Sequence, residues 1–207
     1  MPKITEEKKD EIRMSILHTA RKVFIEKGYE AASMKDIVTS SGRSFGGVYL
    51  YFANKEDVFL ELLRQQFEIM GSQLESRVQN SAWSAFVHFI GEQEIRVREV
   101  ENGLAACMYE YFIVGRREES RRKLIEERYQ AVYGSVLALI NDGIQREEFR
   151  LSQPVDTFVH WLISSLDGIF LESMINGFDN IDAAKQFEFL KTVCRSILMA
   201  NEREENV

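Results

Sequence analysis

Apolar residues recur every three or four positions along most of this chain, and this spacing limits the possible folds more than any other feature. One such stripe comprises Ile12, Ile16, Ala20, Val23 and Phe24. A spacing of three and four places side chains on one face of an α-helix. No segment shows the strict alternation of a half-buried strand, and the sequence holds only two prolines. The pattern predicts an all-α protein.

Glycines and capping residues divide the first part of the chain into short helices. The first stripe ends at a glycine, and Ser33 with Asp36 then forms a capping-box pattern. Gly42 ends this second helix, and Ser44 can begin a third. Residues 10–52 are therefore predicted to form three short helices, with a tight turn between the last two. This is the helix-turn-helix arrangement, in which the second helix of the pair enters the major groove of DNA.

The remainder of the chain is predicted to form longer helices. They cover roughly residues 55–79, 82–99, 103–115, 120–146, 154–176 and 182–200. The breaks between them fall at asparagine, serine and glycine, and at Pro154, which suits a first helical turn.

Charge is distributed unevenly along the chain. Over all 207 residues, 26 Lys and Arg against 33 Asp and Glu give a net charge of −7, an average that disfavours a nucleic-acid binder. Residues 1–58, however, carry ten basic and nine acidic side chains, whereas residues 59–207 carry 16 and 24. We therefore expect any anion-binding surface within the first 58 residues.

The sequence favours a reduced, cytoplasmic setting. No apolar run approaches the roughly 20 residues that span a bilayer, and the N-terminal segment is charged. Cys107 and Cys194 lie in apolar helical patterns and do not form a disulfide framework.

Residues 33–58, SMKDIVTSSGRSFGGVYLYFANKEDV, resemble the DNA-binding signature of the TetR-type transcriptional regulators. The matching positions are Ser33, Ile37, Gly42, Ser44, Gly47, Val48, Tyr49, Tyr51, Phe52, Lys55 and Glu56. The preceding segment ILHTARKVFIEKGYEAASM is similar to the first helix of the family. The resemblance implies a helix-turn-helix DNA-binding domain at residues 1–54 and a helical effector-binding and dimerisation domain at residues 55–207.

Spacing and resemblance together suggest how the third short helix meets DNA. Val48 and Phe52 are four residues apart and are expected to face the core of the small domain. The resemblance implies that Tyr49 contacts phosphate and that its neighbours face the bases. The predicted DNA-binding residues are Ser33, Lys35, Arg43, Ser44, Phe45, Gly46, Gly47, Tyr49, Leu50, Tyr51 and Lys55.

Four of these residues carry particular expectations. Lys55 opens the fourth helix, where a lysine is unfavourable for the helix dipole, so a bound phosphate would account for it; the alternative is an ordinary solvated lysine. Arg43 replaces an apolar residue of the family and is expected to turn toward phosphate. Phe45 occupies a position that is usually polar, and it either contacts a thymine methyl or packs in the core. Gly46, with the glycine after it, would let the backbone approach DNA closely.

Aromatic and apolar residues on helical stripes of the large domain are candidates for an effector pocket. Such stripes are also typical of a core, but the resemblance implies that some line a pocket with a few polar groups. The candidates are Phe67, Met70, Trp83, Phe86, Phe89, Met108, Tyr109, Phe112, Tyr129 and Tyr133. Glu110 interrupts this pattern and is either a buried acid that meets a cation or a surface residue.

The last two helices carry broad apolar faces. Paired with a second copy they would form a four-helix dimer interface, as the resemblance implies, and a dimer reaches two half-sites about 34 Å apart. The alternative is packing within one chain. The predicted interface residues are Phe158, Trp161, Leu162, Ser165, Leu166, Ile169, Phe170, Phe187, Leu190, Val193 and Ile197.

An enzymatic function is poorly supported by the sequence. His88 with Glu92 and Asp156 with His160 are four residues apart, but such coincidences are common on helices, and no phosphate-binding loop, dinucleotide fingerprint or nucleophile elbow occurs. No cofactor or metal site is predicted. A metal-dependent helical-bundle enzyme and an all-helical small-molecule carrier remain the alternatives. The sequence favours a dimeric repressor that binds a palindromic operator in double-stranded DNA and is released by a small, largely apolar effector.

Overall fold

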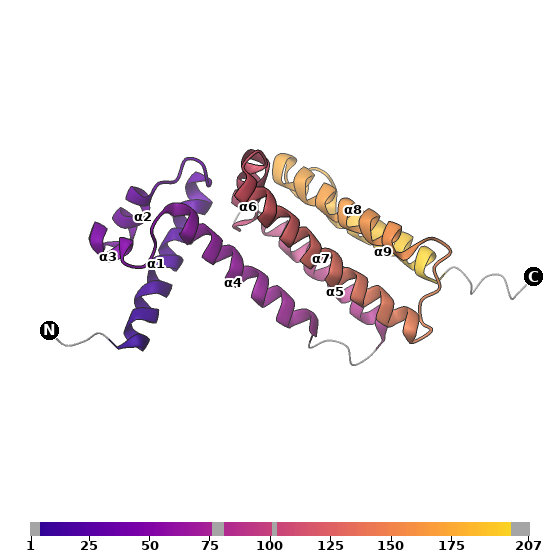
Figure 1. Ribbon diagram of the computed structural model, residues 1–207. Helices are drawn as coiled ribbons and strands as arrows, with labels where there is room; N and C mark the ends of the chain where they lie inside the picture. The colour runs from indigo at the N-terminus through magenta and orange to yellow at the C-terminus, as the bar shows by residue number, and fades with distance from the viewer. Residues whose placement is uncertain (1–4, 76–80, 101–102, 200–207) are drawn as a thin grey trace, which may run out of the picture. The chain divides into compact units, whose positions relative to one another are not determined.

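The computed structural model describes residues 5–75, 81–100 and 103–199, and their side chains except those of residues 66–75. Figure 1 shows the helices, which in chain order are α1 (Glu6–Lys27), α2 (Met34–Ser41), α3 (Phe45–Tyr49), α4 (Lys55–Glu75), α5 (Ala82–Arg98), α6 (Ala105–Gly115), α7 (Glu119–Gln145), α8 (Val155–Asn176) and α9 (Ala183–Leu198). Apart from one isolated bridge between Arg150 and Met199, the described residues contain no extended pairing. The all-α prediction is confirmed, with helix ends within a few residues of those expected.

Local capping accounts for the boundaries of the short helices. Ser33 and Asp36 form a reciprocal capping box, in which the Asp36 carboxylate accepts the Ser33 N–H at 3.0 Å. Gly42 ends α2 in the left-handed conformation with φ 64°, which glycine adopts without strain. The Ser44 hydroxyl accepts the Gly47 N–H at 3.1 Å and so begins α3. These sequence-based cap assignments are confirmed.

The chain forms two compact units. Unit 1 comprises Met1–Met70 and Asn102–Arg121, and unit 2 comprises Gly71–Glu101 and Arg122–Val207. The chain therefore passes between the units within α4 and on either side of α6, which belongs to unit 1. This structural division differs from the boundary at residue 54; the assignment of functional roles to residues 1–54 and 55–207 stays a prediction.

Unit 1 is built around a chain of aromatic contacts. Tyr29 follows α1 and is only 1% exposed. Its ring lies 4.7 Å from the ring centroids of both Phe59 of α4 and Tyr111 of α6, and Phe24 of α1 contacts Phe59 edge-on at 5.0 Å. Because these rings come from three helices and the turn between α1 and α2, the core ties α6 to the short N-terminal helices.

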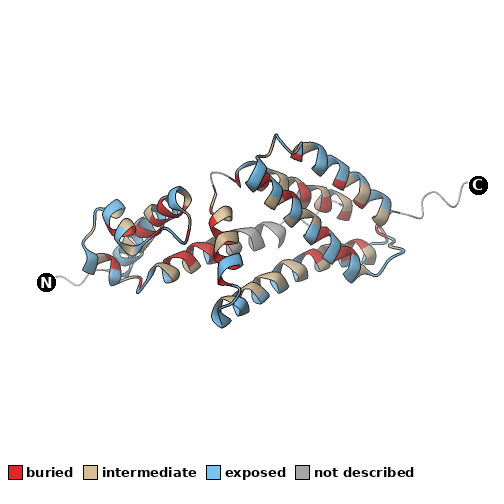
Figure 2. Ribbon diagram, turned by 90° about the horizontal axis from the view of Figure 1, so that it is seen from above, coloured by how far each residue is buried: buried red, intermediate tan, exposed pale blue. Residues whose placement is uncertain are grey.

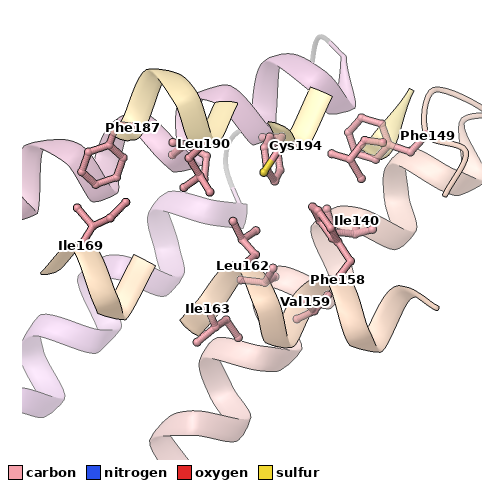
Figure 3. Packing of buried hydrophobic residues seen from close by; sticks show 14 of the residues in the cluster. Ile140, Phe149, Phe158, Val159, Leu162, Ile163, Ile169, Phe187, Leu190 and Cys194 are labelled. Atoms are coloured by element: carbon pink, nitrogen blue, oxygen red, sulfur yellow. The ribbon is translucent and has the colours of Figure 1, made fainter. Parts of the chain in front are cut away.

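Unit 2 is a helical bundle of α5, α7, α8 and α9 around one apolar core. Buried positions recur along one side of these helices, as Figure 2 shows by colour. In Figure 3, Ile169 of α8 lies close to Phe187 of α9, and Leu162 and Leu190 come from the same two helices. Helix α8 is the described segment whose length and composition would allow it to cross a membrane, but several of its apolar residues, among them Phe158, Leu162 and Ile169, belong to this core.

Candidate nucleic-acid interface

Helix α3 is fixed to unit 1 by one side and leaves the other side uncovered. Val48 is fully buried and Phe52, just after the helix, is 4% exposed. The Phe52 ring also lies 5.5 Å below the guanidinium of Arg13 from α1. The expectation that Val48 and Phe52 hold the helix against the core is confirmed.

The uncovered side of α3 is mainly apolar. Phe45 is 55% exposed, Tyr49 is 46% exposed and Leu50 is 76% exposed. The Phe45 and Tyr49 rings are stacked, with centroids 6.3 Å apart and planes within 16°. Phe45 is therefore not a core residue, which excludes packing in the core; its contact with a thymine methyl stays a prediction.

The two glycines of α3 differ in their surroundings. A Cβ atom built on Gly46 would meet no heavy atom within 4 Å, so nothing in the protein requires glycine there. A Cβ on Gly47 would lie 3.1 Å from the capping oxygen of Ser44. The packing of the protein therefore favours glycine at position 47 but not at position 46.

Polar groups beside α3 are free to meet an external partner. The Tyr49 hydroxyl and the exposed Lys35 ammonium of α2 make no hydrogen bond or ion pair with the described residues. Arg43, by contrast, is half-buried, and its Nε atom is buried without a partner among the described residues, so the contact of Arg43 with phosphate stays a prediction. The hydroxyls of Ser33 and Ser44 already serve as helix caps, and Tyr51 is half-buried.

The structure gives Lys55 a role within the protein. Its ammonium donates to the backbone oxygens of Tyr29, Glu30 and Ala32 at 2.7, 3.0 and 3.0 Å. It also lies 4.5 Å from the centre of the Tyr29 ring. Three protons on three carbonyls use every donor of the ammonium, so this group does not depend on phosphate to explain its place at the start of α4.

Glu110 of α6 holds the same turn from the other side. Its carboxylate accepts the backbone N–H of Tyr29 at 2.7 Å and that of Glu30 at 3.2 Å. Gly28 has φ +79°, and a Cβ there would lie 2.7 Å from a Glu110 oxygen. Glu110 is therefore half-buried and accepts from backbone N–H groups, which matches neither of the two alternatives, a buried acid that meets a cation or a surface residue.

A second polar cluster joins α6 to the start of α4. Tyr111 donates to Glu56 at 2.5 Å, and Arg121 lies 3.1 Å from the same carboxylate oxygen. The Arg121 guanidinium also lies 4.5 Å from the Tyr111 ring centre. Burial, with help from the hydrogen bond to Glu56, raises the pKa of Tyr111 well above its usual range. Helix α6 is thus held against the N-terminal helices by both Glu110 and Tyr111.

Ion pairs reinforce the packing of the short helices. The Lys27 ammonium lies 2.5 Å from the Asp36 carboxylate. The hydrogen bond from Lys27 has the largest effect on the pKa of Asp36, the hydrogen bond from Ser33 has the next largest, and the pKa is lowered to about 2. Glu61 of α4 pairs with Arg64 and Arg13, which lower its pKa to about 2. These contacts connect α1 to α2 and α4.

The candidate effector residues are divided between the units. Met108, Tyr109 and Phe112 lie on α6 in unit 1, where Met108 and Phe112 are each 8% exposed. In unit 2, Phe86 is core, whereas Trp83, Phe89, Tyr129 and Tyr133 are half-buried against it. Phe67 and Met70 lie outside the residues whose side chains are described.

Unit 2 contains a cavity that sequence reasoning missed. It has a volume of about 450 Å³ and lies around the α7–α8 turn. None of the candidate effector residues lines it; its walls are Ile144, Glu147, Phe149, Arg150, Leu151, Gln153 and Val155. The apolar residues of its wall belong to helical or core patterns in the sequence, and nothing in these patterns distinguishes a cavity wall from a packed core.

Five of the predicted interface residues are core residues of a single chain. They are at most 8% exposed, because the apolar stripes of α8 and α9 face each other and α5: Phe158, Leu162, Ile169, Phe187 and Leu190. Ser165, Leu166, Phe170, Val193 and Ile197 are half-buried. Trp161 remains 38% exposed, and two residues that the prediction omits, Ile175 and Phe189, are 66% and 70% exposed.

Asp156 and His160 of α8 each contact a tyrosine hydroxyl of α7. The Tyr129 hydroxyl lies 2.5 Å from Nδ1 of His160, and the Tyr133 hydroxyl donates to Asp156. Within the described ranges, no three His, Cys, Asp or Glu side chains are grouped so as to hold a metal ion. Cys107 and Cys194 are buried free thiols, and burial raises their pKa values to about 11 and 12.

Two family models match the chain. The model described as bacterial regulatory proteins, tetR family, matches residues 16–62, and the model described as tetracyclin repressor-like, C-terminal domain, matches residues 85–184. The first match spans the helices that form the candidate interface.

Individual proteins are similar over nearly the full length. The HTH-type transcriptional regulator YfiR of Bacillus subtilis (strain 168) is 32% identical over 203 residues, which cover 98% of this chain and 99% of YfiR. The HTH-type transcriptional repressor AcnR of Corynebacterium diphtheriae is 24% identical over 95% of this chain and 98% of its own. A transcriptional regulator from Saccharomonospora viridis, solved in complex with choline, has a TM-score of 0.77 at 19% identity and covers 91% of this chain and 98% of its own.

Proposed function

Because the chain belongs to the TetR family of DNA-binding transcriptional regulators, we propose that it is a dimeric repressor that binds a palindromic operator through α3. A small, largely apolar effector would release it from DNA. AcnR, a relative over nearly the whole chain, is itself named a repressor.

The observation that carries the proposal is the uncovered face of α3. Phe45, Tyr49 and Leu50 are exposed on a helix whose opposite side is buried, and Gly46 leaves the backbone open between them. A helix that is packed on one side and bare on the other is positioned to enter a groove. The free Tyr49 hydroxyl and the Lys35 ammonium would meet phosphates beside it.

We place the dimer contact on the exposed stripe of α8. Trp161, Ser164, Gly168 and Ile175 are spaced to share one face of the helix. Ser164 and Gly168 are small and exposed, and a Cβ on Gly168 would meet nothing within 4 Å, so a second helix can approach closely there. Phe189 of α9 would contribute a large apolar side chain to the same interface.

We place the effector against the half-buried aromatic residues of unit 2, namely Trp83, Phe89, Tyr129 and Tyr133. Its signal would reach unit 1 through α4 and α6, where the chain passes between the units. Glu110 and Tyr111 bind α6 to the α1–α2 turn and to α4, so a shift of α6 would move the short helices. The effector releases DNA only if it binds more tightly to the conformation that fits the operator poorly.

Selection from random double-stranded DNA tests this function. The full chain is incubated with a random duplex pool at moderate salt, and the bound duplexes are amplified and sequenced. We expect a palindrome whose half-sites are about one helical turn apart. If repeated rounds enrich no sequence, the proposal of an operator-specific regulator is overturned.

A further inference from the structure

The outward face of α3 lacks side chains that make paired hydrogen bonds to bases. The helix is Phe-Gly-Gly-Val-Tyr, followed by Leu50. Its one polar side-chain group is the Tyr49 hydroxyl. The usual hydrogen-bond readers of guanine and adenine are Arg, Lys, Asn and Gln, none of which occurs on this helix.

What α3 presents instead is an exposed and mainly apolar surface. The Phe45 and Tyr49 rings are nearly parallel, with planes within 16° and centroids 6.3 Å apart, and both rings are about half exposed. Leu50, at 76% exposure, extends this surface beside Tyr49. Gly46 adds no side chain, and the space at its Cβ position is open.

The 5-methyl of thymine is the largest apolar group on the base edges of the major groove, and it suits such a surface. Thymine carries a methyl at C5, whereas the other base edges present hydrogen-bond donors and acceptors there. An apolar ring that covers this methyl removes both from water, which is favourable without any hydrogen bond. Placed against guanine or cytosine, the same rings would cover polar edges and leave them unpaired.

We propose that the protein recognises its operator through thymine 5-methyl groups, which the Phe45–Tyr49 ring pair covers in the major groove. The proposal rests on the function proposed above and adds the chemical feature that α3 reads. Lys35 and Arg43, which precede α3 in the chain, would then fix the register through phosphates and carry little sequence information.

Duplexes with uracil in place of thymine test the proposal. Uracil pairs with adenine as thymine does but lacks the methyl, so each replacement removes one CH₃ and leaves the hydrogen bonds intact. Starting from the palindrome selected with the full chain, every thymine is replaced in turn, and affinity is measured by fluorescence anisotropy. At a contacted position we expect about a fourfold loss, and about 15-fold when both symmetric positions are replaced.

A complementary change adds the methyl back. At a contacted position, replacement of the T·A pair by C·G should weaken binding, and 5-methylcytosine in that cytosine's place should recover about fourfold. A recovery of this size identifies the methyl, rather than the shape of the T·A step, as the feature that is read.

Protein variants assign the methyl to the ring pair. For each variant we compare the affinity for the thymine duplex with that for the uracil duplex, as a thymine-to-uracil ratio. Phe45→Ala should reduce this ratio to about one at the position that Phe45 contacts. Tyr49→Phe keeps the ring and should keep the ratio. Ile95→Ala, which truncates a 55%-exposed apolar side chain of unit 2, is the matched control and should leave the ratio unchanged. Because Phe45 is exposed, its truncation should also leave urea unfolding of the protein unchanged.

The outcomes separate this proposal from the one on which it rests. If a palindrome is enriched but no uracil replacement changes affinity by more than 1.5-fold, methyl readout is overturned and the repressor function stands. Retention of the full ratio in Phe45→Ala also overturns it, because another group then reads the methyl. If no palindrome is enriched, both proposals fail.

Discussion

Replacement of Gly46 by alanine should separate stability from DNA binding. No heavy atom lies within 4 Å of the new Cβ, so the protein accommodates it without strain. Alanine is favoured over glycine in a helix, by roughly 0.5–1 kcal/mol, and the gain should be at the low end in a helix of five residues. We therefore expect the free energy of unfolding to rise by about 0.5 kcal/mol in urea titrations.

The same methyl should weaken operator binding. If DNA touches the Gly46 Cα, a Cβ extends about 1.5 Å further and pushes α3 outward by a similar distance. A shift of that size stretches flanking hydrogen bonds beyond their normal range. Loss of one or two such bonds, each worth about 1 kcal/mol, lowers affinity by roughly 5- to 30-fold in an anisotropy titration.

Two further glycines provide controls. Gly134 on α7 also has open space at its Cβ position, so Gly134→Ala should stabilise the protein and leave affinity unchanged. Gly47→Ala places its Cβ 3.1 Å from Ser44 Oγ, so disturbance of the cap should offset the propensity gain and leave stability nearly unchanged. A Gly46→Ala protein that binds operator within twofold of the unmodified chain would refute the close approach of DNA to this helix.

Three other perturbations test the account. Glu110→Ala leaves two backbone N–H groups of the α1–α2 turn without their acceptor and should lower the free energy of unfolding by about 1–3 kcal/mol in urea. The control Glu127→Ala, at an exposed ion pair, should change it by less than about 0.5 kcal/mol. Equal effects of the two substitutions would contradict a structural role for Glu110. Asp36 has its pKa lowered to about 2 from an ordinary value near 3.8, so its pairing with Lys27 stabilises the protein above about pH 4, and this stabilisation is lost as pH falls through 2. Asp36→Asn should flatten the fall in unfolding free energy between pH 4 and 2, and an unchanged slope would contradict the pairing. Gly168→Arg on α8 should convert the dimer to a folded monomer in light scattering, while a dimer that persists would place the interface elsewhere.

Local features of the fold were predictable because their causes are local. The Ser33–Asp36 capping box, the left-handed Gly42 and the Ser44 cap each depend on residues within three or four positions. Helical periodicity likewise identifies Val48 and Phe52 as the buried side of α3. These signals were sufficient to predict the order of the helices and which face of α3 is exposed.

Long-range partners could not be predicted in the same way. The acceptors of Lys55 lie 23 to 26 residues away, and Glu110 meets a backbone N–H 81 residues earlier in the chain. The sequence shows that a lysine at the start of a helix and an acid within an apolar helix are unusual, but it does not show which groups they contact. The acceptors of Lys55 depend on how α4 packs against the α1–α2 turn, and the donors to Glu110 depend on how α6 packs there. No local pattern in the sequence places either helix against this turn.

The stripes of α8 and α9 show a related limit. Periodicity identifies an apolar face, but it does not say whether the same chain or a second copy covers it. Phe158, Leu162 and Phe187 are covered within unit 2, whereas Ile175 and Phe189 are left exposed. The distinction depends on where α5 lies against α8 and α9, which is a tertiary property.

Specific DNA binding by α3 of unit 1 is the property on which the proposed function depends. Its most direct test is the affinity of the full chain for the selected palindrome and for a scrambled duplex of equal length and composition, titrated at the same physiological salt concentration. We expect a preference of at least about 10³-fold for the palindrome, with two protomers on each duplex. Equal affinity for the two duplexes would contradict it.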